Sequence, residues 1–314
     1  MDSEELLITG IGGVGCIWAR NTHSACEGLA DLLLIDGDSS LFENEAEGHM
    51  LSLGEGDSSG CAALAPLAEQ RMLANAPLAE EVLKSAELVV ILTALGGGSG
   101  SGASAEFARQ ARRAGCLTIA ISAMPFECQP LRTRIAEIAL ERLRRNADVC
   151  IQVSLDRLAW RSRERGVDWL EGSGWVEDLA AGLIQMLAKV GLINLDLMDL
   201  RSIVRREGGA TMFVAEGDPD DPEALFAEAM SSPLAGVELA GADGCLLQVE
   251  GGPDLTLGQV DAIADAFTIG LHHDAQVIFG ARVSAELEGT ARVVAVVSGL
   301  SMPMSDPELL DSLM

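Results

Sequence analysis

The sequence predicts an α/β protein with a doubly wound parallel sheet, a long central helix and a C-terminal α+β domain. In the first half, short apolar runs alternate with glycine-rich turns and helical stretches, as in a parallel sheet covered on both faces. In the second half, strands bounded by turn residues dominate, which is typical of an α+β domain. The 314 residues, 48% of them hydrophobic, are enough for roughly two domains.

The first half opens with a strand–turn–helix–strand unit. The strand Leu6–Thr9 enters the glycine-rich turn Gly10–Gly15, a helix starts at Cys16, and Leu32–Ile35 forms the second strand. Leu88–Thr93 is predicted to be another buried strand that leads into a glycine-rich turn and a helix. The other expected elements of this half are the helices Ala103–Ala114 and Leu131–Arg145 and the strands Leu117–Ser122 and Val149–Val153.

The second half is expected to begin with a helix over Val176–Val190, where apolar residues recur at spacings of three and four. Later expected strands are Thr211–Ala215, Cys245–Val249, Ala275–Phe279 and Arg292–Ser298, with helices near Glu223–Met230 and Leu257–Gly270. We therefore divide the chain into a nucleotide-binding domain (1–172), the central helix with the loop that follows it (173–200), a C-terminal domain (201–301) and a short acidic tail (302–314).

Composition excludes several classes of function. A net charge of -27 repels phosphate backbones and anionic membranes, so we expect neither nucleic-acid binding nor direct membrane binding. Apolar runs are far shorter than the ~20 residues of a membrane span, and Met1–Glu5 does not resemble a signal peptide, so we expect a cytoplasmic protein. The cysteines lack paired spacing and the neighbours His272 and His273 point different ways, so we expect no metal site.

The segment Gly96–Gly102 has the clearest chemical meaning. It lies between a buried strand and a helix, where unpaired N–H groups and the helix dipole attract anions and glycine lets phosphate approach closely. A flexible linker is a poor explanation because the segment lies inside a βα unit. The predicted phosphate-binding residues are Gly96, Gly97, Gly98, Ser99, Gly100, Ser101 and Gly102, with Gly12 and Gly13 as a second set of donors.

The same heptad resembles the GGGTGTG-type signature loop of tubulins and FtsZ, with serine in place of threonine. The other segments that resemble FtsZ in the same order are Met124–Phe126, Asp156–Leu158, Gly191–Asp196, and Ser231–Leu234 with Gly251–Leu257. The match runs from about Leu6 to Leu300. The resemblance implies a GTPase domain, a central helix and a C-terminal activation domain. It also implies GTP or GDP as the ligand, Mg²⁺ as its cation, and head-to-tail polymerisation of the chain with itself into cytoskeletal protofilaments.

In this family, the loop after the central helix enters the next subunit's nucleotide pocket and helps to position the attacking water. The resemblance therefore makes Asn194, Asp196 and Asp199 the catalytic residues, so GTP hydrolysis is completed at the subunit interface. Two carboxylates are chemically suited to orient a water or to hold a cation near phosphates. From the residues alone, a helix cap with flanking acids is the favoured explanation.

Several pocket positions depart from the FtsZ pattern. Cys16 and Ile17 occupy the place of a nucleotide-contacting asparagine, and Leu155 replaces another asparagine. The segment Ser58–Leu64 is bulkier than the Gly-Ala-Gly-Ala run that usually senses the γ-phosphate, although Ser58, Ser59 and Gly60 offer polar groups. We therefore expect nucleotide binding to be weaker or less selective for guanine than in a typical FtsZ.

The sugar and base contacts are assigned by the same resemblance. Glu127 is expected at the ribose, Arg132 at the ribose or phosphate, and Asp178 at the base with Trp175 stacked on it. Glu127 and Arg132 are equally well explained as surface charges.

Two other functions stay open. One is a structural filament protein, a pseudo-GTPase with weak or no turnover; the other is a Rossmann oxidoreductase, which only Gly10–Gly15 favours. The short tail lacks the long linker of FtsZ proteins that drive cell division, and we expect a divergent relative that relies on FtsZ-type partner proteins.

Overall fold

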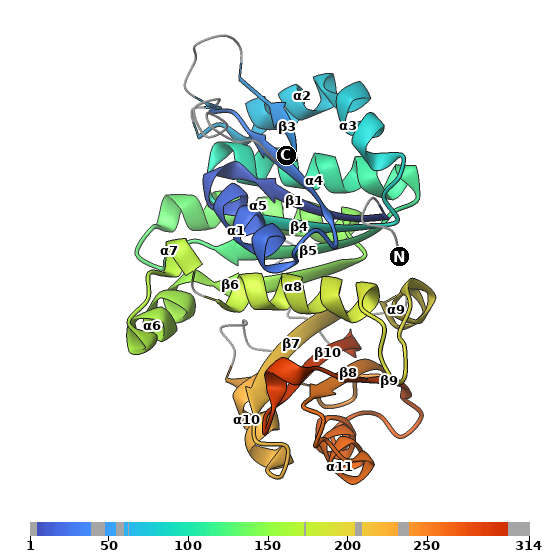
Figure 1. The fold of residues 1–314 in the computed structure, drawn as a ribbon. Helices are drawn as coiled ribbons and strands as arrows, with labels where there is room; N and C mark the ends of the chain where they lie inside the picture. Colours follow the sequence, from blue (N-terminus) through green and yellow to red (C-terminus); the bar gives the residue numbers. More distant parts are fainter. Residues whose placement is uncertain are drawn as a thin grey trace. The chain divides into compact units, whose positions relative to one another are not determined.

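The computed structural model describes residues 5–38, 48–54, 60–61, 63–172, 174–204, 209–231 and 239–300. These residues form two compact units, one containing the described residues up to Ala180 and the other those from Ala181 onward (Figure 1). The predicted roles of Ser58, Ser59, Ser232–Leu234 and the 302–314 tail fall outside the described residues. No helix in the part of the chain that the structure describes is long and apolar enough to cross a bilayer.

The first unit is built on one six-stranded sheet, which confirms the predicted doubly wound parallel fold (Figure 1). Its strands are β1 (Leu6–Ile11), β2 (Asp31–Asp36), β3 (His49–Ser52), β4 (Leu88–Ala94), β5 (Leu117–Met124) and β6 (Val149–Ser154). Their order is β3-β2-β1-β4-β5-β6, and every neighbouring pair is parallel. The direction of winding reverses between β1 and β4, and ligands of such sheets bind beyond the carboxyl ends of the strands at that point.

Helices cover both faces of this sheet, which is why the inner strands are buried along their whole length. On one face lie α2 (Ala65–Ala74), α3 (Ala76–Leu83), α4 (Gly98–Ala114) and α5 (Pro130–Asn146), joined to alternate strand residues in a single apolar core. On the other face lies α1 (Gly12–Ala25), with Trp18 fully buried. The sequence did not predict β3, α2 or α3, and α4 begins at Gly98, not at Ala103.

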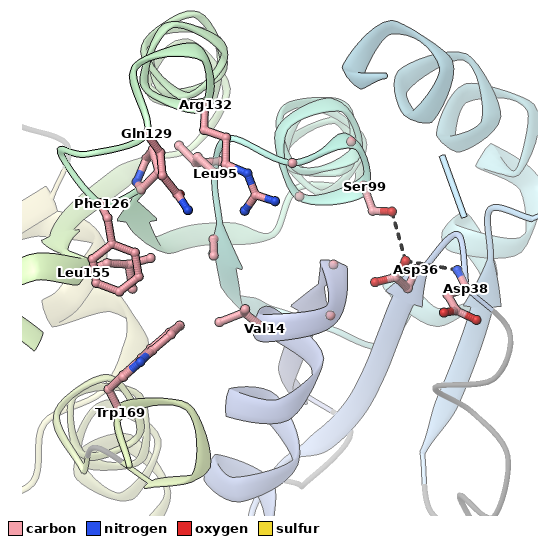
Figure 2. A pocket seen from close by; sticks show the side chains of 17 residues that line it. Val14, Asp36, Asp38, Leu95, Ser99, Phe126, Gln129, Arg132, Leu155 and Trp169 are labelled. Carbon is pink, nitrogen blue, oxygen red and sulfur yellow. Dashed lines mark hydrogen bonds between the residues drawn. The ribbon is translucent and has the colours of Figure 1, made fainter. Parts of the chain in front are cut away.

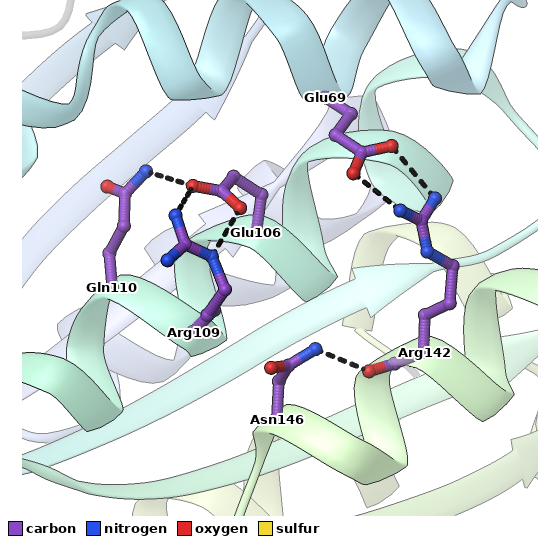
Figure 3. A network of polar contacts seen from close by, with 6 residues as sticks. All are labelled: Glu69, Glu106, Arg109, Gln110, Arg142 and Asn146. Atoms are coloured by element: carbon purple, nitrogen blue, oxygen red, sulfur yellow. Dashed lines mark hydrogen bonds and ion pairs between the residues drawn. The ribbon is translucent and has the colours of Figure 1, made fainter.

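Charged side chains link α5 to α2 and also pair within α4 (Figure 3). Arg142 of α5 donates to Glu69 of α2 at 2.8 Å, and within α4 the Glu106 carboxylate accepts hydrogen bonds from Arg109 at 2.7 Å and Gln110 at 2.8 Å. Burial alone would raise the pKa of Glu106, but these two hydrogen bonds and the charge of Arg109 hold it below the ordinary value of 4.5. Glu106 therefore stays ionised within α4, the helix that begins in the glycine cluster.

Three helices follow the sheet. They are α6 (Leu155–Arg165), the short α7 (Trp169–Gly172) and α8 (Trp175–Ala188). The Ser154 hydroxyl accepts from the Arg157 amide at 3.4 Å and so caps α6. The predicted central helix Val176–Val190 corresponds to α8.

The second unit contains a four-stranded mixed sheet with the order β7-β10-β8-β9. Its elements are α9 (Leu197–Val204), β7 (Gly209–Gly217), α10 (Pro222–Met230), β8 (Gly244–Gly251), α11 (Leu257–Thr268), β9 (Gln276–Val283), a short 3₁₀ helix (Ala285–Leu287) and β10 (Ala291–Leu300). Strand β10 is antiparallel to β7 and β8, whereas β8 and β9 are parallel. This mixed sheet with its helices confirms the predicted C-terminal α+β fold.

Candidate functional site

A pocket of about 580 Å³ opens beyond the carboxyl ends of the first unit's strands, where the strand order reverses (Figure 2). Its volume suits a ligand of nucleotide size. The pocket is lined by Gly12, Gly13, Val14, Asp36, Asp38, Ala94, Leu95, Gly97, Gly98, Ser99, Gly100, Pro125, Phe126, Gln129, Arg132, Leu155 and Trp169.

The amino ends of α1 and α4 both open on this pocket. Neither helix has a side-chain cap, so no capping side chain accepts a hydrogen bond from the first backbone N–H groups. The two ends lie close together: a Cβ added at Gly12, where φ is +80°, would lie 3.0 Å from the Gly100 nitrogen. Uncapped N–H groups and two aligned helix dipoles make this end of the pocket an anion site.

The two serines of the glycine cluster have different environments. The Ser99 hydroxyl lies on the pocket, donates to Asp36 Oδ1 at 2.9 Å and accepts from the Gly37 amide at 3.3 Å (Figure 2). The Ser101 hydroxyl is buried and accepts from the Gly96 amide at 2.8 Å, which holds the turn before α4. Gly97, Gly98, Ser99 and Gly100 thus line the pocket, whereas Gly96, Ser101 and Gly102 are not among the lining residues.

Asp36 and Asp38 give the pocket an acidic wall that the sequence reasoning missed. Asp36 ends β2, is only 5% exposed, and accepts from the Asp38 amide at 3.1 Å in addition to Ser99. Arg132 is the one basic side chain among the lining residues. Oxygen ligands of this kind fit Mg²⁺, which usually binds one or two carboxylates together with phosphates. Their place after the second strand of a βα unit was the signal that could have identified them.

The opposite end of the pocket is apolar. Val14, Leu155, Phe126 and Trp169 lie around it, and the Phe126 and Trp169 rings meet edge to face with centroids 5.6 Å apart (Figure 2). Trp169, at the start of α7, lines the pocket, whereas Trp175, which the sequence reasoning placed against the base, is 8% exposed and does not line it. Pattern alone could not choose between these two tryptophans, which are six residues apart in the sequence.

The three residues predicted to contact the ribose, phosphate or base do not all line this pocket. Arg132 is exposed and lines it. Glu127 is exposed beside it, and the Glu127 amide donates to Asp156 Oδ2 at 3.0 Å. Asp178 is exposed on α8 and is not among the lining residues. The assignment of ribose and base contacts therefore stays a prediction.

The predicted catalytic residues lie in the second unit: Asn194 and Asp196 are between α8 and α9, and Asp199 is in the first turn of α9. Asn194 and Asp196 are exposed and Asp199 is half-buried. Asp196 Oδ1 accepts from the Asp199 amide at 2.9 Å, and Asp199 Oδ2 accepts from the Asp196 amide at 3.0 Å. The two aspartates thus cap the start of α9 reciprocally.

The cysteine side chains in the described part of the chain are mostly buried, whereas one histidine pair is exposed. Cys128 is exposed in the turn after Phe126, whereas the other cysteines are buried. Burial raises the pKa of Cys150 to about 11 and that of Cys245 to about 12. His272 and His273 lie with Asp274 in an exposed turn between α11 and β9, with their potential ligand atoms within 4.8 Å of one another. The centroids of the two imidazole rings are 4.2 Å apart, so the expectation that they point different ways is wrong.

Two family models match the chain. Residues 5–160 match the tubulin/FtsZ family GTPase domain, and residues 208–301 match the FtsZ family C-terminal domain. The cell division protein FtsZ 1 of Archaeoglobus fulgidus is 30% identical over 304 residues, which cover 94% of this chain and 82% of that protein. The first match contains the whole glycine cluster and the second contains the mixed sheet.

Solved structures agree with these matches. An FtsZ mutant from M. jannaschii superposes with a TM-score of 0.81 at 25% identity, covering 94% of this chain and 91% of that one. CetZ2 from Haloferax volcanii, a GTPgS bound protofilament, superposes with a TM-score of 0.78 at 18% identity, covering 98% and 97%. At 18% identity the second comparison shows a shared fold alone.

Proposed function

The chain belongs to the tubulin/FtsZ family, and from this premise we propose that it binds guanine nucleotide in the pocket described above and polymerises head-to-tail into protofilaments. The observation that carries the proposal is the convergence of two uncapped helix ends on a pocket at the switch point of the sheet. The same pocket is polar at one end and aromatic at the other, which matches a ligand with phosphates at one end and a base at the other.

The phosphates belong at the polar end. Backbone N–H groups at the starts of α1 and α4 donate to phosphate oxygens there, and Arg132 adds a positive charge from α5. Asp36 and Asp38 are anions, so a polyphosphate beside them needs a countercharge. These two side chains would hold Mg²⁺, which when bound neutralises part of the charge on the phosphates.

The base belongs at the aromatic end. The indole of Trp169 offers a flat face, with Phe126 against it and Leu155 beside it. Stacking of this kind accepts any purine, whereas discrimination of guanine needs hydrogen bonds to its edge. Gln129, also on the pocket wall, and the exposed Asp178 are the candidates for such bonds. We expect the preference for GTP over ATP to be smaller than in a site that makes several hydrogen bonds to the base.

Hydrolysis is proposed to be completed by the loop of a neighbouring subunit. The exposed side chains of Asn194 and Asp196 and the half-buried side chain of Asp199 would accept hydrogen bonds from a water and orient it toward the γ-phosphorus, giving GDP and inorganic phosphate. The reciprocal cap between the two aspartates keeps both carboxylates in place before a partner arrives. Turnover should therefore rise faster than linearly with protein concentration.

The test combines three measurements on the purified protein. Nucleotide released by denaturation is identified by chromatography, phosphate release is followed against protein concentration with GTP or ATP, and filaments are sought by electron microscopy. We expect bound guanine nucleotide, GTP-dependent filaments and a steep rise of turnover with concentration. Filaments that form equally well without nucleotide, with no phosphate released, would favour the pseudo-GTPase.

Variants separate the roles of the two sites. Asp196→Ala should keep nucleotide binding and filaments but lose most phosphate release, because the pocket is intact and the water is no longer oriented. Asp261→Ala, which removes an exposed carboxylate from α11, is the matched control and should behave as wild type. Equal turnover in the two variants would refute the assignment of the loop.

A further inference from the structure

The loop that carries Asn194 and Asp196 is paired with the edge strand of the mixed sheet. Ala281 of β9 accepts from the Leu192 amide at 2.8 Å and the Ile193 amide at 3.0 Å, and its own amide donates to the Ile193 carbonyl at 3.1 Å. The loop therefore forms an isolated antiparallel β-bridge with the edge strand, which fixes the point from which Asn194 and Asp196 follow.

Close backbone packing makes this pairing tight. A Cβ added at Gly191 would lie 2.6 Å from the Ala281 carbonyl oxygen, and one added at Gly280 would lie 3.0 Å from the Ile193 carbonyl oxygen. Within the loop, the Asn194 side chain accepts from the Gly191 amide at 2.6 Å. Larger residues at either glycine would push the loop off the strand.

The neighbour of Ala281 on β9, Arg282, makes a second connection. Arg282 is 6% exposed and its Nη2 forms an ion pair with Glu250 on β8, which is 7% exposed and lies directly opposite it in the sheet. The Arg282 Nη1 donates to the Gln185 carbonyl at 2.9 Å. That carbonyl belongs to the last turn of α8, where a cation is favoured by the helix dipole.

Two adjacent residues of β9 thus hold both ends of one segment. Arg282 holds the end of α8 from which the loop departs, and Ala281 holds the loop itself three residues before Asp196. A buried ion pair contributes little to stability compared with apolar residues of the same volume. The main effect of this ion pair is therefore expected on the position of the loop.

We propose that Glu250 and Arg282 are positioning residues that fix the loop 191–196 on the mixed sheet and so set the place of Asn194, Asp196 and Asp199. The proposal rests on the proposed function in one respect, because the loop's chemical role is taken from it. The anchoring itself is a property of the second unit alone. Neither residue is among those that line the pocket.

The test is the double variant Glu250→Gln/Arg282→Met, which removes the ion pair and leaves neither a buried charge nor a cavity. The matched control is Glu216→Gln/Arg292→Met, because Arg292 and Glu216 are also opposite each other in this sheet, at 3.0 Å, but are 35% and 48% exposed. Hydrogen exchange of the Leu192 and Ile193 amides reports on the anchoring, and phosphate release per assembled subunit reports on its consequence.

We expect the Glu250/Arg282 variant to exchange these two amides about tenfold faster than wild type and to release phosphate about tenfold more slowly, with nucleotide affinity and melting temperature little changed. The control should alter none of these. Arg282→Lys, which keeps the charge, should fall between wild type and the double variant and provides a second reading if the double variant folds poorly.

Unchanged exchange of the two amides would overturn the proposal, and so would faster exchange with undiminished turnover. If the wild-type protein releases no phosphate, the proposed function fails, while the exchange measurement still decides whether the ion pair anchors the loop.

Discussion

Replacement of Trp169 by alanine tests the placement of the base most directly. Trp169 lines the apolar end of the pocket, and its ring is held by the edge-to-face contact with Phe126 at 5.6 Å. The substitution removes the largest flat surface from the pocket wall without touching the helix ends that would bind phosphate. Nucleotide affinity should fall while the charge of the site stays the same.

The size of the effect follows from the contact that is lost. Stacking of one base on one aromatic side chain is worth about 1–3 kcal/mol, which corresponds to a roughly 5- to 150-fold increase in Kd. Because Phe126 and Leu155 remain beside the vacated space, we expect the lower half of this range for alanine. A phenylalanine at position 169 keeps a ring in place and should cost about threefold or less.

Isothermal titration with GDP and Mg²⁺, at protein concentrations too low for assembly, measures this Kd without turnover. Trp160→Ala is the control, because Trp160 is 60% exposed on α6 and is not among the lining residues. Wild-type affinity in Trp169→Ala, or an equal loss in the Trp160 and Trp169 variants, would refute the stacking of the base on the Trp169 indole.

Three further predictions concern single side chains. Ellman's reagent should label one thiol in the folded protein, at Cys128, and Cys128→Ser should abolish the reaction; bound nucleotide should slow it, because Cys128 lies between lining residues. Asp36→Asn should bind GDP more tightly than wild type when Mg²⁺ is chelated, because a negative charge leaves the phosphate end; titration with EDTA measures this, and unchanged affinity would count against the placement. The lowered pKa of Glu106 makes its ionised form stabilising above the ordinary value of 4.5, and this stability is lost as pH falls through the folded pKa. The difference in unfolding free energy between wild type and Glu106→Gln should therefore shrink below about pH 4.5, measured by urea titration; a constant difference would contradict it.

Much of the fold could be predicted from the sequence because buried parallel strands are apolar runs that glycine-rich turns interrupt. The strands at Leu88–Thr93 and Leu117–Ser122 are clear for this reason. The short β3 was missed because only one of its four residues is buried, which leaves no apolar run. The helix α4 begins inside the glycine cluster because close backbone packing at Gly98, Gly100 and Gly102 outweighs the poor helix propensity of glycine.

The candidate site was predictable only where backbone makes it. The glycine cluster predicts a phosphate site because glycines let a phosphate approach the backbone closely. The structure brings Gly12 and Gly100 together, as that reasoning requires. Asp36, Asp38 and Trp169 were missed because each is one of many acids or aromatics in the chain, and only tertiary structure brings them to one pocket. The pairing of Ile193 and Ala281 likewise joins segments about ninety residues apart.

This difference also bears on the departure at Leu155, which lies at the apolar end of the pocket. An anion site made of backbone N–H groups does not depend on side-chain identity as long as glycine permits the approach, so Ser99 can replace threonine at little cost. A base site is made of side chains, and a change such as Leu155 for asparagine removes a hydrogen bond while it keeps or enlarges the apolar surface. Loss of such bonds weakens discrimination between bases more than it weakens binding, because a buried apolar pocket rejects an altered ligand by far less than an unsatisfied polar group does. Phosphate binding should thus persist in this chain, and selectivity for guanine is the property that its substitutions relax.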